Sequence, residues 1–116
     1  MRKMIKTFAG DFPAGKAVRL ADMVEYGTGA IVSRVLAKGA GGNMTLFAFD
    51  EGQELSEHTA PFDAWVQVEE GEMTVTIDGK PQTVLAGQGI LMPAGIPHAL
   101  VAEKKSVMVL FMIRVG

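Results

Sequence analysis

The two histidines are the side chains of this chain best suited to chemistry. The 116-residue sequence has only His58 and His98, and it has no cysteine. The lack of thiols excludes disulfides, thiolate nucleophiles and cysteine metal sites. An imidazole can bind a transition metal through a ring nitrogen, and because it titrates near neutrality it can also transfer a proton. The sequence therefore predicts a site built around these two residues.

Each histidine lies in a stretch of glycines and prolines with a defined spacing. His58 lies between Gly52 and Gly71, and His98 follows Gly87, Pro93 and Gly95. Glycines permit tight turns with positive φ, and prolines stiffen the loops that deliver a side chain. This arrangement is typical of short strands joined by sharp turns.

The two stretches resemble the paired signature motifs of the cupin superfamily, the small RmlC-like jelly-roll barrels. The first motif reads Gly, five residues, His, one residue, His, three or four residues, Glu, six residues, Gly. In this chain Ala60 occupies the position of the second histidine and Ala64 that of the glutamate. The second motif reads Gly, five residues, Pro, one residue, Gly, two residues, His, three residues, Asn, and Ala102 replaces its asparagine. The resemblance covers about residues 30–113 and implies an all-β, single-domain jelly-roll β-barrel.

The resemblance also implies a metal site that is incomplete here. An intact cupin site holds a divalent ion with three histidines and one glutamate, of which only His58 and His98 remain. One divalent transition metal (Zn, Fe, Ni or Mn) is therefore the expected cofactor if a third ligand exists. Asp63, beside the vacant glutamate position, is the first candidate, although strand alternation turns it away from the interior if Ala64 faces inward. Other candidates, less well placed by their spacing, are Glu54, Glu57 and Gln67. The alternative is a metal-free imidazole pair in a roomier, more apolar pocket.

The elements that must position these residues are short strands. Fourteen glycines and five prolines divide the sequence at regular intervals, which favours a barrel or sandwich. The Asp78-Gly79 pair predicts a hairpin with a type I′ turn. Residues 18–24 fit either a short helix or a strand, within an N-terminal arm of about residues 1–29. We expect about eight strands, at residues 30–36, 44–49, 64–68, 72–77, 82–85, 89–92, 98–102 and 107–113.

Strand alternation and the motif positions predict which side chains line the interior. If His58 points inward, so does Ala60. Across the bend at Pro61-Phe62, the cupin pattern implies that Ala64, Val66 and Val68 lie on the same inner face. Trp65 then points outward, where it and the apolar residues 107–113 favour a homodimer. The predicted pocket is lined by Ala60, Ala64, Val66, Met92 and Ala102.

Composition and charge exclude several classes of partner. The net charge is −2 and the isoelectric point is about 5.6, with no basic stripe, so neither nucleic acid nor an anionic membrane is expected as a partner. No apolar run approaches the roughly 18 residues that a membrane span needs. The basic start at Arg2-Lys3 lacks the apolar stretch of a signal peptide, so a cytoplasmic protein is expected.

Three functions remain compatible with these residues. The favoured one is a binding module that holds a small organic ligand in a barrel whose metal site is reduced. The alternative is a metal-dependent dioxygenase or isomerase that uses His58, His98 and Asp63. A metal-free epimerase is disfavoured because the only tyrosine, Tyr26, lies outside the motifs. No residue is assigned a catalytic role at this level, because the superfamily fold is compatible with many activities.

Overall fold

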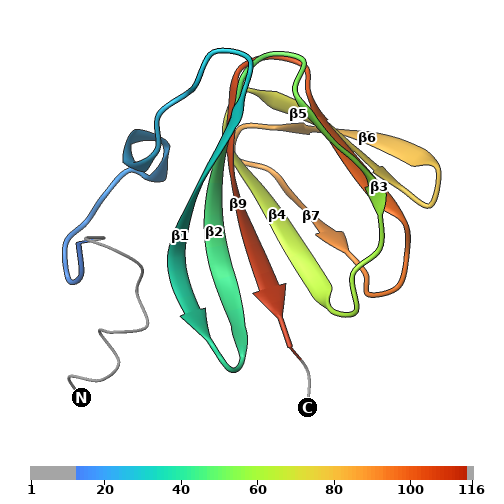
Figure 1. The fold of residues 1–116 in the computed structure, drawn as a ribbon, viewed down its shortest axis with the longest axis horizontal. Coiled ribbons are helices and arrows are strands. Elements are labelled where there is room, and N and C mark those ends of the chain that lie inside the picture. Colours follow the sequence, from blue (N-terminus) through green and yellow to red (C-terminus); the bar gives the residue numbers. More distant parts are fainter. Residues whose placement is uncertain (1–12, 115–116) are drawn as a thin grey trace.

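The computed structural model describes residues 13–114, which form nine strands and one 3₁₀ turn (Figure 1). The first twelve residues of the predicted N-terminal arm, including Arg2-Lys3, lie outside the described residues. The elements are η1 (Leu20–Met23), β1 (Ile31–Gly39), β2 (Gly42–Phe49), β3 (Glu54–His58), β4 (Asp63–Glu70), β5 (Glu72–Ile77), β6 (Lys80–Leu85), β7 (Gly89–Met92), β8 (His98–Ala102) and β9 (Ser106–Ile113).

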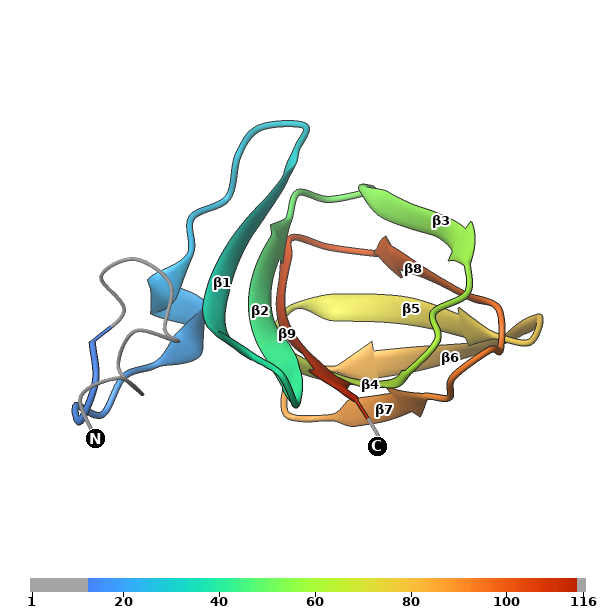
Figure 2. The ribbon, with the colours of Figure 1, turned by 60° about the horizontal axis from the view of Figure 1, so that its bottom comes forward.

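The strands form two antiparallel sheets around a common interior (Figure 2). One has the order β1-β2-β9-β4-β7 and the other β3-β8-β5-β6. The last strand, β9, pairs between β2 and β4, so strands distant in sequence become neighbours. This connectivity confirms the predicted jelly roll, although the two sheets remain separate hydrogen-bonded units rather than one closed ladder.

Local sequence accounts for most element boundaries, with one exception. Asp78 and Gly79 have φ values of 53° and 77°, which confirms positive φ at both turn residues. Leu20–Met23 forms a 3₁₀ turn, which decides between the two alternatives for residues 18–24. Strand β3, however, was not among the expected strands. Its sequence Glu-Leu-Ser-Glu-His is mostly polar and exposed, so it lacks the apolar pattern that marks a strand.

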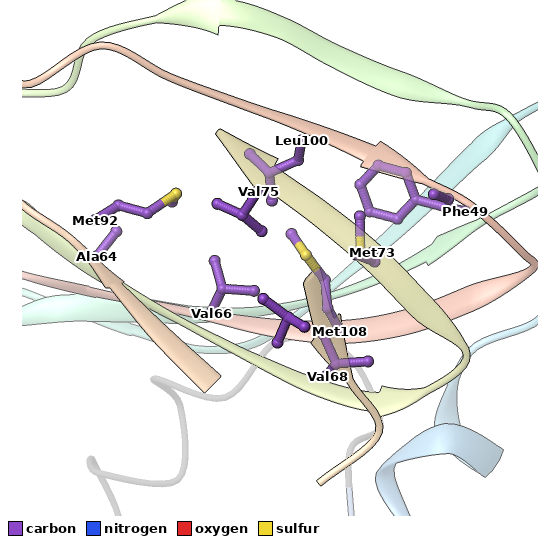
Figure 3. Close-up of a cluster of buried hydrophobic side chains, with 11 residues drawn as sticks. Phe49, Ala64, Val66, Val68, Met73, Val75, Met92, Leu100 and Met108 are labelled. Atoms are coloured by element: carbon purple, nitrogen blue, oxygen red, sulfur yellow. The ribbon is translucent and has the colours of Figure 1, made fainter. Parts of the chain in front are cut away.

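The alternation of β4 places its small and branched residues inside. Ala64, Val66 and Val68 are buried, with exposures of 3%, 0% and 0%, whereas Trp65 between them is 37% exposed. Figure 3 shows this inner face packed against Val75 and Leu100 of the facing sheet. The prediction of which β4 side chains face the interior is therefore confirmed. The burial of these apolar side chains stabilises the two-layer arrangement.

The segment before β1 covers part of the outer face of the first sheet. Met23 packs against an outer cluster that includes Leu46 and Val109. The Arg34 guanidinium donates a hydrogen bond to the Met23 carbonyl at 2.8 Å. Within residues 13–114, no helix is both long and apolar enough to cross a membrane.

Candidate functional site

The structure brings the two histidines into direct contact. His58 ends β3 and His98 begins β8, and the two residues are paired in register across the sheet. Their Nε2 atoms lie 3.1 Å apart, with ring centroids separated by 4.4 Å and ring planes inclined by 74°. The pair reaches from the surface to the interior, because His58 is exposed and His98 is only 3% exposed.

Two loops hold this pair in place. The Gly95 N–H donates to the Ala60 carbonyl at 2.8 Å, which ties the loop before β8 to the loop after β3. The Asp78 N–H donates to the Pro97 carbonyl at 2.9 Å, which fixes the residue directly before His98. Gly95 has a φ of 75°, a left-handed conformation that favours glycine. The second motif therefore works as a rigid loop that delivers His98.

The hydrogen bonds of the pair indicate which ring nitrogens donate and which accept. Nδ1 of His58 lies 2.8 Å from the Ser56 carbonyl, which can only accept, so this nitrogen carries the proton. Its Nε2 then accepts a hydrogen bond from Nε2–H of His98. Nδ1 of His98 is buried and has no hydrogen-bond partner among the described residues, although the Ile96 backbone lies close enough to raise the pKa of this residue.

The environment of His98 favours its neutral form. Burial lowers the pKa of His98, and the nearby His58 ring lowers it further, while the Ile96 backbone opposes the shift in part. Desolvation disfavours the charged imidazolium because the surrounding side chains are apolar. The inner imidazole of the pair is therefore neutral at physiological pH.

A small apolar cavity lies next to the two rings. Its volume is about 60 Å³, which exceeds the roughly 10–15 Å³ needed to hold one water molecule. Of the predicted pocket residues, Ala60, Ala64 and Met92 lie on its wall. Val66 and Ala102 are buried in the core and are not part of the wall.

Sequence reasoning did not assign the rest of this wall. β9 contributes Met108, Leu110 and Met112, and the facing sheet contributes Leu55 and Leu100. Alternation along β9 was the available signal, because these three residues share one face of that strand. The wall is therefore built from both sheets, with the imidazole pair as its main polar feature.

Asp63 does not join the histidine pair. Its Oδ1 accepts a hydrogen bond of 2.8 Å from the Ala94 N–H, which ties the start of β4 to the loop after β7. Across residues 13–114 there is no group of three His, Cys, Asp or Glu side chains that could hold a metal ion. Two imidazoles without a carboxylate do not fit the three- or four-ligand divalent site that the superfamily implies.

Comparison with known proteins identifies the family. The cupin domain model matches residues 45–114 of this chain. The chain belongs to the cupin family. The superfamily and the jelly-roll fold predicted from the two motifs are thereby confirmed.

Solved structures support the same assignment. The conserved SPY1581 protein of unknown function from Streptococcus pyogenes is 34% identical, with 94% of this chain and 96% of that chain covered and a TM-score of 0.87. A cupin 2 conserved barrel domain protein from Leptotrichia buccalis is 41% identical, with a TM-score of 0.78. The match covers 81% of this chain and 46% of that chain. A cupin superfamily protein from Desulfitobacterium hafniense, 22% identical with a TM-score of 0.85, covers 91% of this chain and 97% of that chain and shares the fold. No curated protein matches this cupin in sequence.

Proposed function

We propose that this cupin binds a small organic molecule in the cavity beside His58 and His98. The observation that carries the proposal is the combination of an apolar wall with one polar feature, the imidazole pair. Small-molecule sites are commonly apolar cavities in which a few polar groups fix the orientation of the ligand. This cavity has that composition at the position where the superfamily places its site.

The chemistry of the pair indicates what the ligand should offer. The imidazole rings that line the cavity would form a hydrogen bond with a hydroxyl or carboxyl group of the ligand. The exposed edge of His58 would face a ligand that enters from solvent. The volume of about 60 Å³ limits the ligand to a few heavy atoms, unless the flexible methionines of the wall rearrange. We therefore propose a compact ligand with one polar group and a short apolar part.

The alternative, a divalent-metal enzyme with Asp63 as third ligand, has no structural observation in its favour. The Asp63 carboxylate is used to hold the Ala94 backbone. The imidazole pair could still exchange a proton with a bound ligand, because one ring donates to the other.

The proposal is tested with short-chain probes on the full-length protein. Isopropanol, 2-butanol and butyric acid are titrated while backbone amide signals are followed by NMR. We expect saturable shifts near Ala64 and His98, and the loss of these shifts in Ala64→Val, whose extra methyl groups occupy the cavity. Ala86→Val is the matched control, because Ala86 is exposed in the turn before β7. Saturable binding that survives Ala64→Val, or shifts confined to another surface, would contradict the proposed site.

A further inference from the structure

We propose that the same cavity is a binding site for a soft monovalent metal ion, Cu(I), held by the imidazole Nε2 atoms of His58 and His98 and the thioether sulfurs of Met92 and Met112. This goes beyond the proposed organic ligand and shares with that proposal only the location of the cavity. Within residues 13–114 the two histidines have no carboxylate beside them, so they do not match the divalent metal site of the superfamily. The wall of the cavity beside them nevertheless carries methionines.

The sheet register places two methionines on either side of the vacant glutamate position. Ala64 pairs with Met92 of β7 on one side and with Met112 of β9 on the other. Side chains of directly paired residues in a sheet lie on the same face and are close neighbours. Both methionines line the cavity, and Figure 3 shows Met92 beside Ala64 with its side chain directed into the interior. The short Ala64 side chain leaves the space between them open.

The imidazole nitrogens lie on the opposite wall of this cavity. The Nε2 atoms of His58 and His98 are 3.1 Å apart, and both rings line the cavity. Two nitrogens at this separation can both bind one ion at the metal–nitrogen distance of about 2.0 Å. For this, the neutral His98 ring must carry its proton on Nδ1 instead of Nε2, a change of tautomer with no net gain or loss of protons. Four candidate donors therefore surround one space.

The donor set selects the type of ion. Thioethers are soft ligands that favour Cu(I), whereas carboxylates and water favour harder divalent ions. All four donors are neutral and the rest of the wall is apolar, so a single positive charge is less costly to bury than a double one. Met108 is fully buried and also lines the cavity, but it is not one of the four proposed donors. The set has the composition of a Cu(I) site and not of a zinc or iron site.

The competing explanation is that the methionines only fill an irregular core. Substitution by leucine separates the two, because leucine has a similar volume and no sulfur. Met73 provides a matched control: it is fully buried in the same core cluster as Met92 but does not line the cavity. Loss of ion binding in Met92→Leu and Met112→Leu, but not in Met73→Leu, requires a role for the sulfur atoms.

The test is an anaerobic titration of the metal-free full chain with Cu(I) in competition with a chromogenic Cu(I) chelator. We expect one tightly held equivalent, and an affinity lower by about tenfold or more in Met92→Leu, Met112→Leu and His98→Gln, since removal of groups that merely orient ligands already costs 10–100-fold. Met73→Leu should bind as the unaltered protein does. In addition, methionine methyl signals of the unaltered protein are followed by NMR during titration with Ag(I), a redox-inert substitute. The methyl signals of Met92 and Met112 should shift and that of Met73 should not, and this measurement needs no variant to fold.

Absence of a tight Cu(I) equivalent, equal affinity in the Met92→Leu and Met73→Leu proteins, or Ag(I) shifts confined to methionines outside the cavity would each overturn the inference. The organic-ligand proposal fails separately, through probe binding that ignores Ala64→Val. Cu(I) binding without saturable binding of the alcohol or acid probes would support the metal site and reject the organic ligand. Binding of the alcohol or acid probes without Cu(I) binding would support the organic ligand and reject the metal site.

Discussion

The interior of this cupin has two contrasting regions built by the same strands. At one, Phe49, Val68 and Met73 fill the space between the sheets with no exposed surface. At the other, Ala64 of the same strand as Val68 leaves a cavity of about 60 Å³ beside the histidine pair. Figure 3 shows both regions along β4, with Phe49 and Met73 at one side and Ala64 and Met92 at the other.

The difference shows how one barrel combines stability with a binding site. The packed region carries large apolar side chains whose burial stabilises the fold. In the cavity region, alanines occupy two positions where the cupin motif has metal ligands, so both charge and volume are reduced there. The packed region should therefore respond strongly to lost volume, whereas the cavity region should tolerate added volume.

The largest effect is expected from truncation in the packed region. Phe49→Ala should destabilise the protein by about 3–5 kcal/mol, because a fully buried ring leaves a cavity that the neighbours cannot close. Urea denaturation followed by the fluorescence of Trp65 measures the free energy of unfolding. Leu55→Ala at the cavity wall, where the side chain is only half-buried, should cost clearly less. An equal cost at both sites would remove the contrast between the regions.

A matched pair of alanine substitutions gives the next largest effect. Ala102→Val should destabilise by about 1–3 kcal/mol, because Ala102 is fully buried and does not line the cavity beside the histidines. Ala64→Val should leave the free energy of unfolding unchanged or raise it by about 0.5 kcal/mol or more, because its methyl groups enter existing space. Thermal and urea unfolding of both variants provide the comparison. A larger loss of unfolding free energy in Ala64→Val than in Ala102→Val would show that the cavity cannot accept the added methyl groups.

The pH dependence of the metal-free protein should reveal the environment of His98. Because burial lowers the pKa of His98 in the folded state, the unfolded chain binds the proton more readily. The pKa of a histidine in the unfolded chain is about 6.5, and above that pH this residue should not change the free energy of unfolding. As the pH drops below that value, the free energy of unfolding should fall, until the imidazole of the folded protein is protonated as well. The slope cannot exceed about 1.4 kcal/mol per pH unit for one group.

His98→Gln is the control for this measurement, because the amide keeps a polar group without titrating. Urea unfolding between pH 7.5 and pH 5 should show a smaller slope in this variant than in the unaltered protein. Identical slopes would mean that the buried imidazole does not account for the acid sensitivity of the cavity region.

The smallest effect is expected at Asp63. Asp63→Asn keeps the oxygen that accepts the Ala94 N–H and removes only the charge, so stability should change by about 0.5 kcal/mol or less. Asp63→Ala removes the acceptor and should cost about 1 kcal/mol. Cu(I) affinity should be the same in Asp63→Asn as in the unaltered protein. A strong loss of affinity in Asp63→Asn would restore the carboxylate as a metal ligand.

Local patterns were sufficient to predict much of this molecule. The resemblance of the glycine, proline and histidine spacing to the cupin motifs predicted the jelly roll, and period-two alternation predicted the buried face of β4. Strand β3 was not predicted because its mostly polar residues do not alternate with apolar ones. It forms a strand because it pairs with β8. The methionines of β9 were predicted to lie on a strand, but their place on the cavity wall depends on contacts across the sheets.

The sequence by itself determined the short strands and their turns, the two imidazoles and the resemblance to the cupin motifs that implied the fold, because turn chemistry, strand alternation and motif spacing are local properties. Only the tertiary structure decided that their Nε2 atoms lie 3.1 Å apart, that Asp63 holds the Ala94 backbone, and that Met92 and Met112 flank Ala64. These relations join residues far apart in the chain, and they depend on which strands become neighbours. The volume of the cavity was also decided there, because it is what the side chains of two facing sheets leave unfilled.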